Sequence, residues 1–264
     1  MSARSSAGRC ATRRREADIG ILNKLPRVLA LLLPALLAGP AAASDTGLAI
    51  PTHEALYHAS VRGIPVRVGL RLEARDNGFY HYHSWAEPRG LLGFINRELT
   101  ETSLFTLADG RVVPISYRKR DEFGDRHSDM RFDPVAGTVQ IRYRGRESTV
   151  DWEPGIYDLL SLRVALAHDL ARGELGEVYR VVDDRGRVDA VDVTVAAQEP
   201  LDTPLGRLDT VRLEYYSERR DRLFRLWIAP EMDTALVALE QYEGGELRGR
   251  LEIVEYQRLD AAGD

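Results

Sequence analysis

Apolar residues alternate with polar ones through most of this chain, and a period of two is typical of β-strands with one buried face. The alternation is strict over residues 66–75, where the valines, leucines and alanine share one face. Residues 76–78, Asp-Asn-Gly, then predict a tight hairpin turn, because asparagine and glycine both tolerate a positive φ. The chain should therefore return antiparallel over residues 79–86.

Similar segments follow at short spacing, separated by turns rich in glycine, aspartate and proline. Regular strands joined by tight turns indicate an antiparallel meander, and we expect roughly a dozen strands in one sheet. The predicted strands cover residues 55–62, 66–75, 79–86, 98–107, 112–120, 129–133, 138–143, 147–152, 178–183, 188–197, 206–217, 223–228, 235–242 and 247–257.

One long helix interrupts this run of strands. After Pro154 and Gly155, apolar residues recur at three- and four-residue steps, Asp158 is placed to cap the first free amides, and Gly173 follows the last apolar turn. A sheet of this many strands must curl or split, and so apolar a helix must pack against it. We therefore predict a mainly β fold, an antiparallel open or incomplete β-barrel with one long helix packed on the concave face.

The first 43 residues have the features of an export signal. Seven basic residues precede an apolar run at residues 28–37, and Ala41, Ala42 and Ala43 offer a cleavage site of small residues. We predict a signal peptide over residues 1–43, cleaved after Ala43, and a single mainly β domain over residues 44–264. The alternative is an uncleaved membrane anchor, but the apolar run is shorter than the ~20 residues of a spanning helix.

Removal of the signal would leave 29 basic and 39 acidic residues. This excess of negative charge argues against nucleic acid or an anionic lipid surface as a partner. The single cysteine, Cys10, lies within the signal, which excludes a disulfide, a thiol nucleophile and a lipid-modified cysteine after cleavage. We expect a soluble periplasmic protein that does not span a membrane.

No catalytic motif is recognisable: the sequence lacks a GxSxG elbow, an HExxH helix and a glycine-rich phosphate loop. Ser161 follows Asp158 by three positions, which is the spacing of a helix cap. His81 and His83 share one side of a predicted strand, as two metal ligands would, but no third ligand has a recognisable spacing. We therefore predict no catalytic residue, no metal site, no cofactor and no enzymatic activity.

Large apolar side chains are candidates for a second role. Most should fill the core, but some could also line a concave pocket for an acyl chain or a similar ligand. We expect the helix and residues 90–95, which are apolar and rich in glycine, to gate access. The predicted pocket residues are Trp85, Phe94, Trp152, Tyr157, Leu159, Leu166 and Trp227.

Five short motifs carry a resemblance that spans residues 56–257. They are Gly-Ile-Pro at 63–65, Pro-Gly at 154–155, Asp-Leu-Leu-Ser at 158–161, Thr-Pro-Leu-Gly at 203–206 and Trp-Ile-Ala at 227–229. In order and spacing they resemble domain-of-unknown-function family 3108, whose members are exported Gram-negative proteins. The resemblance implies an envelope protein with no established catalytic residues. More distantly, the predicted architecture looks like the open half-barrels of periplasmic lipoprotein and lipid carriers, a likeness of fold alone.

These observations favour a periplasmic, non-enzymatic protein that binds or carries an apolar or amphipathic, lipid-like molecule of the envelope. The alternative is an envelope assembly or protein-interaction factor with an envelope protein partner and no small-molecule ligand. A third reading, an envelope hydrolase, has no motif to support it.

Overall fold

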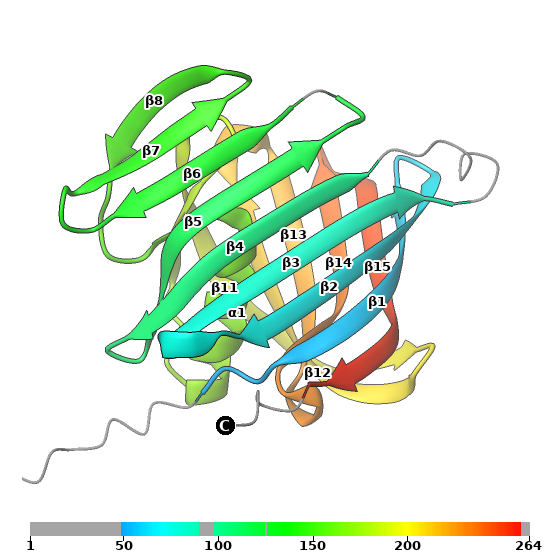
Figure 1. The fold of residues 1–264 in the computed structure, drawn as a ribbon. Coiled ribbons are helices and arrows are strands. Elements are labelled where there is room, and N and C mark those ends of the chain that lie inside the picture. The colour runs from blue at the N-terminus through cyan, green and yellow to red at the C-terminus, as the bar shows by residue number, and fades with distance from the viewer. Residues whose placement is uncertain (1–48, 90–97, 125, 260–264) are drawn as a thin grey trace, which may run out of the picture. The chain divides into compact units, whose positions relative to one another are not determined.

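The computed structural model describes residues 49–89, 98–124 and 126–259. They form a mainly β fold around one open sheet (Figure 1). The predicted signal peptide and the predicted gate at residues 90–95 lie outside the described residues. The strands are β1 (His53–Val61), β2 (Ile64–Ala74), β3 (Phe79–Pro88), β4 (Leu99–Ala108), β5 (Arg111–Asp121), β6 (Ser128–Asp133), β7 (Thr138–Tyr143), β8 (Arg146–Asp151), β9 (Ile156–Tyr157), β10 (Val178–Val182), β11 (Val188–Thr203), β12 (Gly206–Ser217), β13 (Arg222–Ala229), β14 (Ala235–Glu243) and β15 (Glu246–Arg258).

The strands follow one another in the sheet almost as they do in the chain. Their order is β8-β7-β6-β5-β4-β3-β2-β1-β15-β14-β13-β12-β11-β10-β9. The ladder between β1 and β15, with His53 opposite Arg258, joins the two runs of hairpins. β9 pairs with β10 in parallel, and the other ladders are antiparallel. β8 and β9 are the two edges, so the sheet is not closed.

The strand number corrects the sequence-based expectation: the sheet has 15 strands rather than roughly a dozen. The unexpected strand is β9, which has only two residues and directly precedes the helix. A period of two cannot be recognised in two residues. The predicted hairpin turn is confirmed, because Asn77 and Gly78 have φ of 63° and 76°. This turn forms the short 3-10 element η1 (Asp76–Gly78), and two others are η3 (Glu218–Arg220) and η4 (Pro230–Met232).

The helix α1 (Leu159–Arg172) begins and ends where the sequence predicts. The Asp158 carboxylate accepts hydrogen bonds from the backbone N–H groups of Leu160 and Ser161 at 2.9 and 3.0 Å. The Ser161 hydroxyl accepts one from the Asp158 N–H at 3.0 Å, which completes a capping box. At the other end Gly173 adopts a left-handed conformation with φ of 69°.

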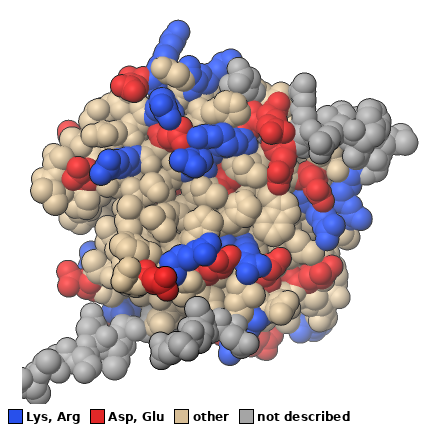
Figure 2. All heavy atoms as spheres, in the orientation of Figure 1, with Lys and Arg blue, Asp and Glu red and all other residues tan. Residues whose placement is uncertain are grey.

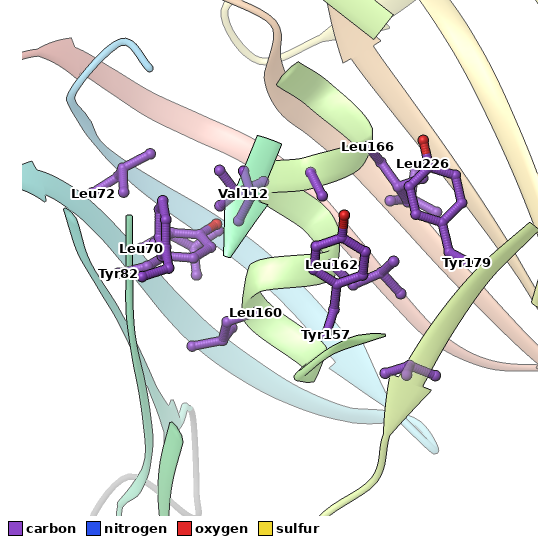
Figure 3. Close-up of a cluster of buried hydrophobic side chains, with 14 of the residues drawn as sticks. Leu70, Leu72, Tyr82, Val112, Tyr157, Leu160, Leu162, Leu166, Tyr179 and Leu226 are labelled. Carbon is purple, nitrogen blue, oxygen red and sulfur yellow. The ribbon is translucent and has the colours of Figure 1, made fainter. Parts of the chain in front are cut away.

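The sheet curves around α1, which lies between the side formed by β1–β5 and the side formed by β11–β14 (Figure 1). The backbone of the helix lies nearest to β4, β5, β9 and β10. Its side chains Leu160, Leu162 and Leu166 are at most 1% exposed. Figure 3 shows them among side chains from the sheet, including Leu70, Leu72, Tyr82, Val112, Tyr157, Tyr179 and Leu226.

The outer face of the sheet is polar. Arg71 on β2, for example, pairs with Glu54 on β1 at 3.0 Å. Figure 2 shows acidic and basic side chains interspersed on the visible face, without a large area of one sign. In the part of the chain that the structure describes, no helix has the length and apolar character needed to cross a membrane.

Candidate functional site

A cavity of about 280 Å³ lies between one face of α1 and the strands around it. Most of its surface is apolar, and its lining comes from segments far apart in the sequence. The residues that line it are Ala49, Ile50, Pro51, His53, Leu72, Tyr82, Arg163, Val164, Ala167, His168, Ala171, Leu226, Ile228, Pro230, Asp233, Thr234, Ala235 and Leu236. Its volume is near the lower end of the ~300–1,000 Å³ typical of small-molecule sites.

The helix supplies one wall through residues spaced for a single face. Arg163, Ala167 and Ala171 recur at four-residue steps, with Val164 and His168 beside them. The two alanines leave space between the helix and the sheet, because their side chains are short. His168 is buried, and its Nε2 lies 3.1 Å from the carbonyl oxygen of Gly110 on the β4–β5 turn.

The opposite wall consists of inward-facing positions on three strands. Leu72 and Tyr82 are direct cross-strand partners on β2 and β3, and Leu226 and Ile228 are alternate residues of β13. Successive side chains of a strand point to opposite faces, so these positions share the concave face of the sheet. All four are at most 4% exposed, which makes this wall apolar apart from the Tyr82 hydroxyl.

Two ionisable groups at the cavity already have partners in the protein. Burial lowers the pKa of His53, whose Nδ1 lies 3.3 Å from the Pro51 carbonyl oxygen. Burial acts to raise the pKa of Asp233, but hydrogen bonds from Arg258 and Tyr256 outweigh it and hold the pKa below its usual value. Those bonds come from Arg258 Nε at 2.7 Å and the Tyr256 hydroxyl at 2.9 Å.

Two other polar groups, Arg163 and the Tyr82 hydroxyl, form no hydrogen bond or ion pair with any residue that the structure describes. Arg163 is half-buried and Tyr82 is only 4% exposed. Burial raises the pKa of Tyr82 to about 12, and the positive charge of Arg163 acts to lower it. The same charge acts on the buried Tyr57 and Tyr215, so Arg163 lies among neutral phenols rather than carboxylates.

Of the predicted pocket residues, Trp85 and Trp227 lie on the outer side of the sheet. Trp85 is on the β3 face opposite to Tyr82 and packs on Gly69, where an added Cβ would lie 2.0 Å from its ring. Trp227 lies between Leu226 and Ile228 in β13, and its indole N–H donates to Glu199 at 2.9 Å. Neither residue lines the cavity between the helix and the sheet.

The remaining predicted pocket residues are core residues or lie outside the description. Leu166 is completely buried, and the ring of Tyr157 is 6.0 Å from that of Tyr179. Leu159 and Trp152 are half-buried and pack against the core. None of these four lines the cavity. Phe94 lies outside the described residues.

The positions considered for chemistry lie in two places, at the beginning of α1 and on the outer face of β3. The Ser161 hydroxyl donates to the Asp158 carboxylate at 2.7 Å, and both residues are completely buried. His81 and His83 stack on the outer face of β3 with ring centroids 6.3 Å apart. Within residues 49–89, 98–124 and 126–259, no group of three or more His, Cys, Asp or Glu residues could hold a metal ion.

The comparison with protein families decides where this chain belongs. The model of the family described as protein of unknown function DUF3108 matches residues 57–248, which is most of the chain. The chain belongs to the DUF3108 family. The resemblance inferred from the sequence is therefore confirmed. No curated protein sequence matches this member of the family.

Two solved structures of low sequence identity are similar to this chain. A β-barrel-like protein of the unknown-function family DUF1849 from Brucella abortus is 13% identical, covers 80% of this chain and 99% of its own, and gives a TM-score of 0.55. A Bacteroides fragilis protein described as exported, with a YmcC-like fold, is 11% identical and covers 78% and 95% of the two chains with a TM-score of 0.38. At 13% identity, the Brucella structure supports the fold and nothing beyond it.

Sequence reasoning missed the residues that line the cavity. Ile50, Leu72 and Ile228 come from three separate parts of the chain, and no local pattern brings them together. One signal was available, because Arg163 is a charged residue in the middle of a helix that is apolar on nearly all sides. A half-buried charge without a carboxylate partner loses hydration that other polar groups must replace, so its position draws attention to the cavity.

Proposed function

We propose that this DUF3108 protein binds an apolar or amphipathic molecule of the bacterial envelope in the cavity between α1 and the sheet. The observation that supports the proposal is the cavity itself, about 280 Å³ in volume and lined mainly by apolar side chains. Concave apolar sites with a few polar groups are the usual form of small-molecule binding sites. The role is one of binding or carriage without catalysis, and it takes place in the periplasm after cleavage at Ala43.

Native mass spectrometry tests the proposal. The processed protein is recovered without detergent from cells that express the full chain, and solvent extraction identifies what it carries. We expect a stoichiometric apolar or amphipathic adduct. A mass equal to that of the polypeptide, before and after incubation with total envelope lipid, would overturn the proposal.

A matched pair of substitutions locates the adduct. Ala167→Phe places a large ring in the cavity, whereas Ala190→Phe adds the same ring at an exposed position of β11. We expect the first variant to lose the adduct and the second to keep it. Ala171→Phe is a second cavity variant for the case in which Ala167→Phe does not fold, because Ala171 is more exposed and tolerates a larger side chain more easily. Retention of the adduct by a folded cavity variant would place binding elsewhere.

An envelope assembly or protein-interaction role remains the second candidate, and the open edge of the sheet favours it. β8 is mostly exposed and has a paired strand on one side only, so an extended segment of another protein could extend the sheet there. Its side chains include Arg146, Glu147 and Asp151, and such charges protect edges from unspecific pairing. Crosslinking in cells to one dominant protein, with no bound amphiphile, would favour this role.

A further inference from the structure

The cavity contains positive charge without a matching negative charge in the described part of the chain. Arg163 lies on the face of α1 that lines the cavity, and none of the described carboxylates pairs with it. The one carboxylate among the described lining residues, Asp233, is already bound by Arg258. A guanidinium that is partly removed from water loses hydration, and only an opposite charge or several acceptors compensate for that loss.

A second hydrogen-bond donor faces the same space. The Tyr82 side chain lines the cavity from β3, is 4% exposed, and donates to no described acceptor. By contrast, the Tyr57 hydroxyl donates to the Leu236 carbonyl oxygen at 2.8 Å and is satisfied. The Tyr82 hydroxyl oxygen is not among the fully enclosed atoms that lack a partner, so it is open to the cavity and can donate to an acceptor there.

The two donors differ in type but suit one kind of group. Arginine presents a planar set of N–H donors that matches the oxygens of carboxylate or phosphate, and a phenol adds one O–H donor. Both side chains line the same cavity, and the positive charge of Arg163 acts to lower the pKa of Tyr82. The other lining side chains nearby, Val164, Ala167 and Leu72, are apolar. The site therefore combines an anion-binding end with an apolar body.

We infer that the ligand is an anionic amphiphile whose carboxylate or phosphate head group is bound by Arg163 and Tyr82, with its alkyl chain in the cavity. The inference rests on the proposed function and narrows its ligand to one chemical class. Charge-assisted hydrogen bonds in a site of low dielectric are stronger than neutral ones. Arg163 therefore sets the preference for a negative head group, and the alkyl chain supplies the apolar contact.

Isothermal titration calorimetry with four probes of equal chain length tests the inference. Dodecanoate, dodecyl phosphate and dodecyltrimethylammonium are titrated below their micelle concentrations, and dodecanol below its solubility limit, into protein recovered from cells expressing the full chain. We expect at least one of the two anionic probes to bind about tenfold more tightly than dodecanol, and the cation to bind most weakly. The stronger of the two anions identifies the head group as carboxylate or phosphate.

Three variants at the head-group site and one control variant elsewhere separate the site from general effects of charge. Arg163→Gln should weaken the preferred anion about tenfold and leave dodecanol unchanged, and Tyr82→Phe should have a smaller effect of the same kind. Arg163→Lys should restore part of the loss, because it restores the charge without the planar donors. Arg131→Gln removes the same charge from an exposed position of β6 and should change nothing.

The possible outcomes test the anionic head group separately from the proposed function of binding an amphiphile. The inference would be overturned if dodecanoate, dodecyl phosphate and dodecanol bound equally tightly and Arg163→Gln changed none of the three affinities. That result would still support an apolar binding site in the cavity. Failure of all four probes to bind, together with an adduct-free mass spectrum, would overturn the proposed function as well. Loss of dodecanol binding in a folded Arg163→Gln protein would show that Arg163 shapes the cavity rather than binding a head group.

Discussion

The Ser103 hydroxyl on β4 donates a hydrogen bond of 2.8 Å to the carboxylate of Asp158 at the beginning of α1. Both residues are completely buried, and the same carboxylate caps the helix. Burial raises the pKa of Asp158, and hydrogen bonds from Ser161 and Ser103 act in the opposite direction. One side chain thus begins the helix and attaches it to the sheet.

We expect Asp158→Ala to lower the free energy of unfolding by roughly 2–4 kcal/mol. An N-cap contributes about 0.5–2 kcal/mol, and a buried hydroxyl left without its acceptor adds about 1–3 kcal/mol. Ser103→Ala should cost less, because the cap remains intact. Urea unfolding followed by circular dichroism at pH 7 measures both. Equal losses for the two variants would contradict the dual role of this carboxylate.

The contact between Gly69 and Trp85 predicts an unusually costly small substitution. A Cβ at position 69 would lie 2.0 Å from the indole ring, so Gly69→Ala must displace Trp85. We expect a loss of about 1–3 kcal/mol, as for other overpacked sites, with a shift in tryptophan emission. Gly249→Ala is the matched control, since its added Cβ comes no nearer than 3.7 Å to the Ser60 carbonyl oxygen. If both variants unfold at the same urea concentration, the packing described for Trp85 is wrong.

Packing of the helix against the sheet is tested at Leu166. This side chain has no exposed surface, so Leu166→Ala should destabilise the protein by about 2–5 kcal/mol. Leu170, one turn later, is only partly buried, and Leu170→Ala should cost clearly less. The midpoints of urea unfolding give the comparison. An order reversed between the two would mean that another face of α1 contacts the sheet.

Acid should destabilise the protein in part through Asp183. Burial acts to raise the pKa of this carboxyl, but hydrogen bonds from Arg187 and the charge of Arg220 hold it below the usual 3.8. The unfolded chain therefore binds this proton at a higher pH than the folded chain. The stabilisation is present above about pH 4 and is lost as the pH falls through 3.8 toward the lower folded value.

The measurement compares urea unfolding at pH 7 and at pH 3 for the parent and for Asp183→Asn. We expect the variant to be less stable at pH 7 and to lose less stability on acidification than the parent does. Asp209→Asn, at an exposed carboxylate of β12, is the control and should follow the parent at both values. The same loss of stability on acidification in all three proteins would exclude Asp183 as a source of acid sensitivity.

Local features of this fold could be predicted from the sequence, and features that depend on distant contacts could not. The limits of α1 depend on Asp158 and Gly173, and the β2–β3 hairpin depends on Asn77 and Gly78, so each is decided within a few residues. The open, mainly antiparallel sheet followed from the regular strands. The two-residue β9 did not, because its pairing with β10 is fixed only after the helix returns the chain.

The candidate site shows the limit of reasoning from side-chain size. Trp85 and Trp227 are the kind of large apolar residue that lines pockets, yet their strand positions turn them to the outer face. Trp85 has the parity of His81 and His83 and the opposite parity to Tyr82, which was a readable signal. The small residues Ala167 and Ala171 create the space, and nothing in their local sequence marks them for that role.

The pairing of the first strand with the last has a consequence for folding. Thr52, beside β1, donates to the carbonyl oxygen of Leu259, 207 positions later, and β1 and β15 are the one pair of sheet neighbours among the described strands that are not consecutive in the chain. The other ladders join consecutive strands and can form locally. One side of β1 pairs with β2, but its other side stays unpaired until β15 arrives. Until then it offers an open edge to other unfolded chains. A chain truncated before β15 would keep this aggregation-prone edge.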